Sequence, residues 1–197
     1  MIITFGRQHG SNGHDIARAL ATELGYTCYD KEIVDHAAEN SSFSREIFGT
    51  YDEKRVNSYI VPAPHYVGMH EGFRLNMQVA SAQFDAIRSL ADRGNGIFVG
   101  RCADYILRGR DDVVRVFIMA DKEFRLKTLM ERKGISAEQA MKLMKEVDKD
   151  RSSYYKYYTD QIWGEAENYD LCIDSSRLGV EGAVKVISAY IEALQAK

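Results

Sequence analysis

The residues best suited to chemistry lie in a glycine-rich stretch close to the start of the sequence. Ile2–Phe5 is a short apolar run that predicts a buried strand, and a helical spacing of apolar residues begins at His14. A strand, a glycine-rich turn and a helix in succession present backbone N–H groups to a phosphate at the helix N-terminus. The residues expected to bind phosphate groups there are Gly10, Ser11, Asn12, Gly13, His14 and Asp15.

This stretch departs from the strict phosphate-loop pattern G-x-x-x-x-G-K-[ST], because no lysine precedes Lys31. Arg7 is the residue expected to supply the missing cation, with His14 as a partial substitute. Asp15 stands where a hydroxyl residue would normally contact a metal ion, so we expect it to bind Mg²⁺ directly or through water. The alternative for the whole stretch is a tight strand-to-helix turn that binds no ligand.

Arginines at four further positions fit the transfer of a phosphoryl group, which needs cations on the oxygens that gain charge: Arg101, Arg125, Arg132 and Arg151. Arg101 follows an apolar strand and a glycine, at the sheet edge where open α/β folds bind ligands. Asp104 is expected to hold Arg101 or to bind the metal ion through water; an ordinary charge at a helix N-terminus is the alternative. Arg132 and Arg151 flank a segment that could close over a ligand. The alternative for each arginine is a solvated surface charge. For Arg125 this alternative is a pair with Asp121 or Glu123 on an exposed helix.

The elements that must position these residues alternate between strand and helix. Strands are expected at 26–29, 97–99, 113–119 and 171–173, and helices at 14–24, 30–37, 71–93, 122–131 and 180–194. A capping box of Ser136 and Gln139 predicts the start of one more helix. The alternation predicts a single α/β domain over 1–197, with helices around a mostly parallel sheet. The segments 40–70 and 132–165 interrupt it and are candidates for pieces that close over a substrate.

The composition restricts the class of protein. A net charge of −3 over 197 residues gives no basic field for nucleic acid, and no apolar stretch approaches the roughly 20 residues that span a bilayer. We therefore expect no nucleic-acid partner, no membrane partner and a cytoplasmic location. Cys28, Cys102 and Cys172 lack disulfide or metal spacing and are expected to be buried free thiols. The tyrosine run within 154–158 is interpreted as helix packing, with stacking on a nucleobase as the alternative.

Four stretches, taken in order, resemble the cytidylate kinase-like family of P-loop proteins. Residues 3–17 are similar to that family's first strand and phosphate loop, in which the lysine is also commonly missing. Residues 29–33, with the sequence Tyr-Asp-Lys-Glu-Ile, match the family's YDKEI segment, and residues 99–104 are similar to the G-R-D segment of cytidylate kinases. Residues 148–171 resemble the basic lid segment and the last strand. The likeness covers nearly the whole chain, and the order and spacing of the motifs carry it.

The resemblance implies a three-layer P-loop nucleoside-monophosphate kinase fold, with a parallel central sheet and a helical lid. It implies ATP and Mg²⁺ as cofactors. An acceptor-binding insert is expected at about 30–95 and the lid at about 132–165. The resemblance puts Arg101 on the phosphate of the acceptor, and Arg132 and Arg151 over the transferring group.

The acceptor implied by the resemblance is a nucleoside monophosphate, with CMP or dCMP as the best match. Its site is expected at Asp30, Lys31, Arg101 and Asp104. Cytidylate kinases carry T-G-A-x-Y-R after the aspartate, whereas Lys-Glu-Ile follows Asp30 here. Two alternatives therefore stay open: a nucleotide-binding sensor or regulatory protein without kinase turnover, and a kinase for another small acceptor. The long helix expected at 71–93 could serve a homodimer.

Overall fold

A parallel sheet forms the centre of the fold. The computed structural model describes residues 1–55 and 67–196, and side chains from residue 74 onward in the second range. Within these residues the sheet has five parallel strands in the order β2-β3-β1-β4-β5. The strands are β1 (Ile2–Arg7), β2 (Thr27–Tyr29), β3 (Gly96–Val99), β4 (Val113–Met119) and β5 (Leu171–Asp174). The strand order reverses beside the central β1, and open α/β sheets bind ligands at the carboxyl ends of the strands near such a point.

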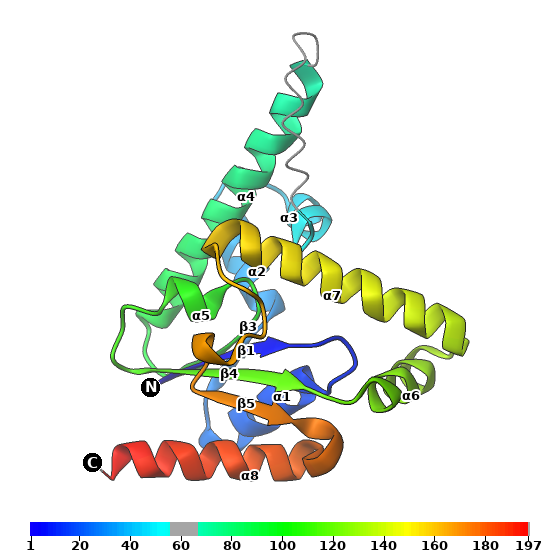
Figure 1. The fold of residues 1–197 in the computed structure, drawn as a ribbon. Helices are drawn as coiled ribbons and strands as arrows, with labels where there is room; N and C mark the ends of the chain where they lie inside the picture. Colours follow the sequence, from blue (N-terminus) through cyan, green and yellow to red (C-terminus); the bar gives the residue numbers. More distant parts are fainter. Residues whose placement is uncertain (56–66, 197) are drawn as a thin grey trace.

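Helices cover both faces of this sheet (Figure 1). They are α1 (Gly13–Leu24), α2 (Lys31–Glu39), α3 (Arg45–Tyr51), α4 (Val67–Ala91), α5 (Ala103–Ile106), α6 (Lys122–Lys133), α7 (Ala137–Thr159) and α8 (Ser175–Gln195), with a short 3₁₀ helix, η1 (Ala166–Asn168). The helices α1 and α8 pack on one face, and α2, α4 and α5 on the other. The predicted three-layer α/β fold with a parallel sheet is confirmed.

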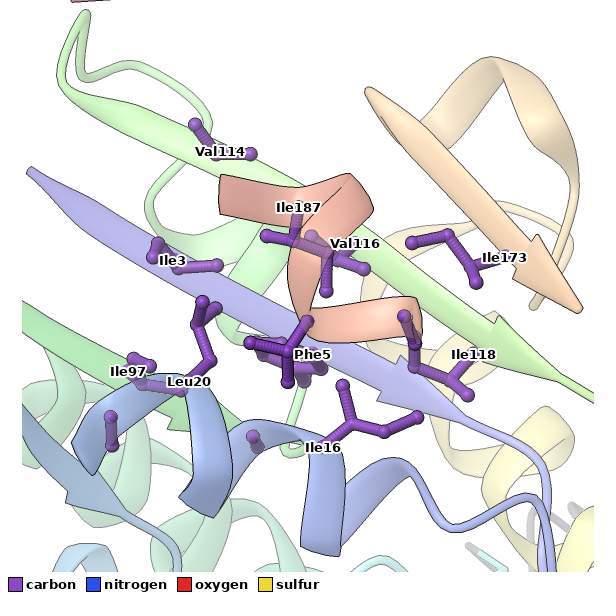
Figure 2. Packing of buried hydrophobic residues seen from close by; sticks show 14 of the residues in the cluster. Ile3, Phe5, Ile16, Leu20, Ile97, Val114, Val116, Ile118, Ile173 and Ile187 are labelled. Atoms are coloured by element: carbon purple, nitrogen blue, oxygen red, sulfur yellow. The ribbon is translucent and has the colours of Figure 1, made fainter. Parts of the chain in front are cut away.

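The first face of the sheet is sealed by α1 and α8 (Figure 2). Phe5 of β1 shares a hydrophobic cluster with Ile16 and Leu20 of α1 and with Ile187 of α8, and each of the four is at most 1% exposed. Because β1 is covered on both faces, its apolar residues run on without alternation, as is typical of parallel strands. This packing fixes the strand end from which the glycine-rich loop departs.

The second face is sealed mainly by α2 and α4. Phe98 of β3 shares a cluster with Ile33 of α2 and Ile87 of α4, all fully buried. The N-terminal part of α4 projects away from the sheet (Figure 1). That this helix serves a homodimer stays a prediction.

The helices α6 and α7 form a hairpin, and α7 returns above the sheet (Figure 1). A left-handed Gly134 (φ 62°) ends α6, and Ser136 and Gln139 form the predicted capping box at the start of α7. Near the other end of α7, Tyr154 and Tyr155 are buried against Cys102, which follows β3. The interpretation of the tyrosine run as packing is therefore confirmed for these two residues.

The helix expected at 180–194 is present after a break at Gly179 (φ 65°, ψ −171°), and a short helical segment capped by Asp174 precedes it from Ser175. The expectation that all three thiols are buried is wrong for one of them. Cys172 is exposed because β5 is an edge strand, whereas Cys102 is buried and Cys28 is partly buried. Of the segment 40–70, residues 56–66 lie outside the described residues, and α3 lies in the part that is described. In the part of the chain that is described, no helix combines the length and the apolar character that crossing a membrane requires.

Ile187→Ala is expected to lower the free energy of unfolding by about 2–5 kcal/mol, because it opens a cavity between α8 and the sheet. The adjacent Val186 is 40% exposed against 0% for Ile187, so Val186→Ala is the matched control. The control is expected to change stability by less than about 0.5 kcal/mol. Urea unfolding followed by circular dichroism measures both variants, and equal losses would contradict this packing of α8.

Candidate active site

Three segments meet at the carboxyl edge of the sheet, beside the point where the strand order reverses. Arg7 ends β1, Asp30 follows β2, and Gly100 and Arg101 follow β3. Parallel strands end at the same edge, so the sheet itself brings these distant residues together. Three of the sequence-predicted site residues thus share one location.

The guanidinium group of Arg101 is buried, with 4% of the side chain exposed. It donates from Nε and Nη2 to the two oxygens of Asp52, at 2.7 and 2.6 Å, and from Nη1 to Asp30 at 3.0 Å. Burial alone would lower its pKa, but the carboxylates of Asp52, Glu53 and Asp30 raise the pKa well above the ordinary value. The expectation that Asp104 holds Arg101 is wrong, because Asp52 and Asp30 take that role.

Glu53 lies among the remaining cations of this edge. Its Oε1 accepts from Nη1 of Arg7 at 2.6 Å and from the backbone N–H of Arg101 at 3.0 Å. Its Oε2 accepts from Nε of Arg151 at 3.1 Å, so one carboxylate joins three arginines. Burial would raise the pKa of this carboxyl, but the arginines hold it well below its usual range. The backbone of Glu53 is left-handed (φ 51°), a conformation that costs a non-glycine residue about 1–2 kcal/mol.

Arg7 also packs on the glycine-rich loop. A Cβ atom added to Gly13, the first residue of α1, would lie 2.5 Å from the Cβ of Arg7. The stem of Arg7 therefore occupies the space beside the helix N-terminus that a longer residue at this position would need.

The loop between β1 and α1 is held by its own turn residues and by the core. Gly10 (φ 84°) and Asn12 (φ 58°) are left-handed, and a Cβ at Gly10 would lie 2.8 Å from a backbone oxygen of α6. The Ser11 hydroxyl is buried and lies 2.8 Å from the carbonyl oxygen of Gln8. Because that side chain faces inward, Ser11 can offer only backbone groups to a ligand. His14 contacts Asp30 at 3.0 Å and so links the loop to the end of β2.

The hairpin of α6 and α7 contacts the same loop through one ion pair and two hydrogen bonds. Arg132 pairs with Asp15 and donates to the side chain of Asn12 at 2.8 Å. Asp148 accepts from Arg125 at 2.7 Å and from the backbone N–H of His9 at 2.8 Å. Arg125 is buried and its partner comes from the facing helix α7, so the alternative of a pair with a neighbour on an exposed helix is wrong.

A small cavity lies beneath the arginines. Its volume is about 20 Å³, and its lining includes Arg7, Glu53, Arg101, Arg151, Asp104 and Trp163. The Asp104 carboxylate accepts from the hydroxyl of Tyr155 at 2.6 Å. Burial raises the pKa of Asp104 to about 6. The space is about that of one water molecule, so the side chains around it nearly fill the site.

The predicted metal ligand, Asp15, is partly exposed at the N-terminus of α1 and pairs with Arg132. Within the described residues, no cluster of three or more His, Cys, Asp and Glu side chains could hold a metal ion. A Mg²⁺ site of the kind that uses one carboxylate together with phosphate oxygens needs no such cluster. Lys31, the first residue of α2, is exposed.

The sequence profile of the cytidylate kinase-like family matches residues 2–177. The chain belongs to the cytidylate kinase-like family. A cytidylate kinase of Methanothrix thermoacetophila is 31% identical over 197 residues, which cover 99% of this chain and 100% of that relative. A cytidylate kinase of Methanococcus vannielii is 28% identical, covering 98% of this chain and 100% of that one. This family member is therefore an enzyme of the nucleoside-monophosphate kinase type.

Solved structures agree with the fold of the kinase. An uncharacterized protein from Eubacterium ventriosum is similar with a TM-score of 0.76 and 29% identity, covering 98% of both chains. A shikimate kinase from Bacteroides thetaiotaomicron is similar with a TM-score of 0.57 and 12% identity, covering 98% of both chains. At that low identity the second similarity shows the P-loop kinase fold alone.

Sequence reasoning missed the carboxylates of the kinase's site: Asp52, Glu53 and Asp148. The first two lie in the stretch 40–70, where no periodicity indicated a structure. The signal that could have found them is indirect. Several arginines predicted to gather in one buried place need counter-ions, because an unpaired buried charge is strongly unfavourable.

Gly100→Ala is expected to lower the free energy of unfolding of the kinase by about 1–3 kcal/mol. Gly100 is left-handed (φ 77°), and a Cβ there would collide with the Glu53 carboxylate and the Arg7 guanidinium. Gly109→Ala is the matched control, because a Cβ there meets no atom within 4 Å. Thermal unfolding compares the two variants, and a Gly100→Ala protein as stable as the control would contradict the packing around Glu53.

The stability of the kinase is expected to fall between about pH 4 and pH 6 because of Asp104. The pKa of its carboxyl is 3.8 by ordinary values and about 6 in the folded chain. In this window the folded state binds more protons than the unfolded state, so stability falls as pH rises and levels off above pH 6.

Asp104→Asn should remove this decline, which amounts to about 3 kcal/mol for a shift of this size. The measurement is the free energy of unfolding at half-unit steps from pH 4 to pH 7. The control is Asp160→Asn, whose side chain is 95% exposed and which should keep the wild-type slope. Parallel profiles for wild type and Asp104→Asn would contradict the raised pKa.

Proposed function

We propose that the chain transfers the γ-phosphate of ATP to a cytidine monophosphate, CMP or dCMP. The observation that carries this proposal is the gathering of Arg7, Arg101 and Arg151 around one buried volume beside the glycine-rich loop. Phosphoryl transfer needs alignment and positive charge more than covalent chemistry. Guanidinium groups suit it because each can hold two phosphate oxygens at once.

The donor side of the proposal uses the loop Gly10–Asp15. Its backbone N–H groups and the N-terminus of α1 would hold the phosphates of ATP, as the strand–turn–helix arrangement favours. Arg7 would take the part of the missing lysine, since its stem already packs on Gly13. Asp15 offers the hard oxygen ligand that suits Mg²⁺, and the ion would neutralise charge on the donor phosphates. If Asp15 binds the metal ion, Arg132 would lose its ion pair with Asp15 and would contact a phosphate oxygen instead.

The acceptor side uses the ends of β2 and β3. Asp30, Lys31, Arg101 and Asp104 would surround the acceptor, with Arg101 on its phosphate. Cytidylate is favoured over other nucleotides because the two relatives named above are cytidylate kinases. They are 28–31% identical to this chain, and the match covers their full lengths. The insert at about 30–95 and the lid at about 132–165 would close together and exclude water, which otherwise competes as the acceptor.

Two further arginines would act on the transferring group itself. Arg151 comes from α7, 14% exposed, and contacts both Glu53 and the backbone oxygen of Arg7. Arg132 comes from the end of α6 and reaches the loop at Asn12. Both would stabilise the charge that develops on the transferring group, from opposite ends of the helical hairpin.

A competing proposal is a nucleotide-binding sensor without turnover, favoured by the loop without a lysine. The test measures ADP release from ATP and Mg²⁺ with CMP, dCMP, UMP, AMP and GMP as separate acceptors. Turnover with CMP or dCMP is the expected result. ATP binding without turnover on any acceptor would favour the sensor, and turnover with another acceptor alone would overturn the cytidylate assignment.

Arg7→Ala is expected to lower kcat by about 10²–10³-fold, the usual effect of removing one group that stabilises developing charge. The matched control is Arg88→Ala, because Arg88 is 56% exposed on α4 and pairs with Asp85. The control should keep the wild-type kcat. Both variants are checked for folding by circular dichroism, and a folded Arg7→Ala protein with wild-type kcat and KM would remove Arg7 from the site.

A further inference from the structure

Two adjacent carboxylates occupy the arginine cluster formed by Arg7, Arg101 and Arg151. The two carboxylate oxygens of Asp52 accept hydrogen bonds from Nε and Nη2 of Arg101, at 2.7 and 2.6 Å. The two carboxylate oxygens of Glu53 accept hydrogen bonds from Arg7 and Arg151, at 2.6 and 3.1 Å. A carboxylate between guanidinium groups offers them the same kind of oxygen acceptors as a phosphate does.

The backbone at this point shows that the carboxylates are held there against a local preference. The helix α3 ends at Tyr51, Asp52 is extended, and Glu53 is left-handed at φ 51°. Left-handed conformations are unfavourable for residues with a Cβ, and glutamate gains no local hydrogen bond that would favour one. The ion pairs with the arginines therefore have to offset the strain.

Little space is left around the cluster while Glu53 is in place. The cavity that it shares with Arg7, Arg101 and Arg151 measures about 20 Å³. That volume accommodates one water molecule. Glu53 already accepts hydrogen bonds from Nη1 of Arg7 and Nε of Arg151, so a phosphate can take these donors only if the Glu53 side chain leaves them.

We propose that Asp52 and Glu53 act as an internal competitor for the arginine cluster and restrict it to ligands that carry at least two negative charges. The proposal rests on the proposed function only in taking the three arginines as the phosphate-binding groups. In the free chain the two carboxylates neutralise the arginines. A ligand binds by displacing Glu53, and Asp52 stays on Arg101 to fix its orientation or leaves with Glu53.

The charge of the ligand decides whether it can displace Glu53 from the arginine cluster. A singly charged carboxylate ligand would replace Glu53 like for like and gain nothing, because Glu53 is already tethered to the site. A phosphate dianion brings a second charge and a third oxygen to a place that holds several buried guanidinium groups. Burial and the neighbouring Arg7 lower the pKa of Arg151. The positive charge of Arg151 is therefore unfavourable here unless an anion lies beside it.

The test measures the binding of inorganic pyrophosphate through the fluorescence of Trp163. This is the single tryptophan of the chain, and it lines the same cavity. Glu53→Gln is expected to lower the Kd for pyrophosphate about tenfold, the scale of one lost charge-assisted hydrogen bond. Acetate should bind measurably to Glu53→Gln and not to wild type.

Two further variants separate competition from a simple change of charge. Glu192→Gln removes the same charge from an exposed position on α8, at the far side of the sheet, and should leave the Kd at the wild-type value (Figure 1). Glu53→Asp keeps the charge but shortens the side chain by one methylene, so it can no longer bridge Arg7 and Arg151. Competition predicts tighter pyrophosphate binding for Glu53→Asp, whereas a purely electrostatic effect predicts none.

An unchanged or raised Kd in both Glu53 variants would overturn the proposal, and so would the failure of both variants to fold, since a competitor is dispensable for folding. The readout needs no turnover, so it stands apart from the kinase assay. Tighter binding by an inactive chain would support the competitor and contradict the proposed function. Turnover of wild type with an unchanged Kd in the variants would contradict the competitor alone.

Discussion

Arg7, Arg101 and Arg151 are brought close together in a largely buried place, and like charges so placed repel unless anions separate them. The rest of the site follows from this constraint. Asp52 and Glu53 supply the anions in the free chain, at contacts of 2.6–3.1 Å. The exchange of these carboxylates for phosphate groups is what the proposed kinase reaction would require, because both kinds of anion offer oxygen acceptors to the same guanidinium groups.

The parallel sheet is the reason that the charges meet. Its strands end at a common edge, and two buried clusters hold α1 and α8 on one face and α2 and α4 on the other. Small residues then let the groups approach. Gly13 leaves room for the stem of Arg7, and Gly100, at φ 77°, leaves room for Glu53. The hairpin of α6 and α7 adds Arg151 from above, anchored by Tyr154 and Tyr155.

The sequence predicts the frame of this protein better than its site. Apolar runs bounded by glycine indicate β1 and β3, because these central parallel strands are buried on both faces. The capping box at Ser136 was equally local. The partners of the arginines were not local: Asp52 lies in a stretch without periodicity, and only the fold brings it to Arg101. The sequence favours Asp104 as the partner of Arg101 because the two residues are close along the chain. In the fold the Asp104 carboxylate accepts a hydrogen bond from Tyr155 instead. The roles predicted for the loop residues and for the arginines stay predictions.

The most direct test of the account is a crystal structure of the chain with a bisubstrate analogue that joins adenosine and cytidine through a chain of phosphates. The account predicts that the guanidinium groups of Arg7, Arg101 and Arg151 lie within hydrogen-bond distance of phosphate oxygens, and that Glu53 has left the cluster. A complex in which the analogue binds elsewhere, while Glu53 still joins Arg7 to Arg151, would contradict it.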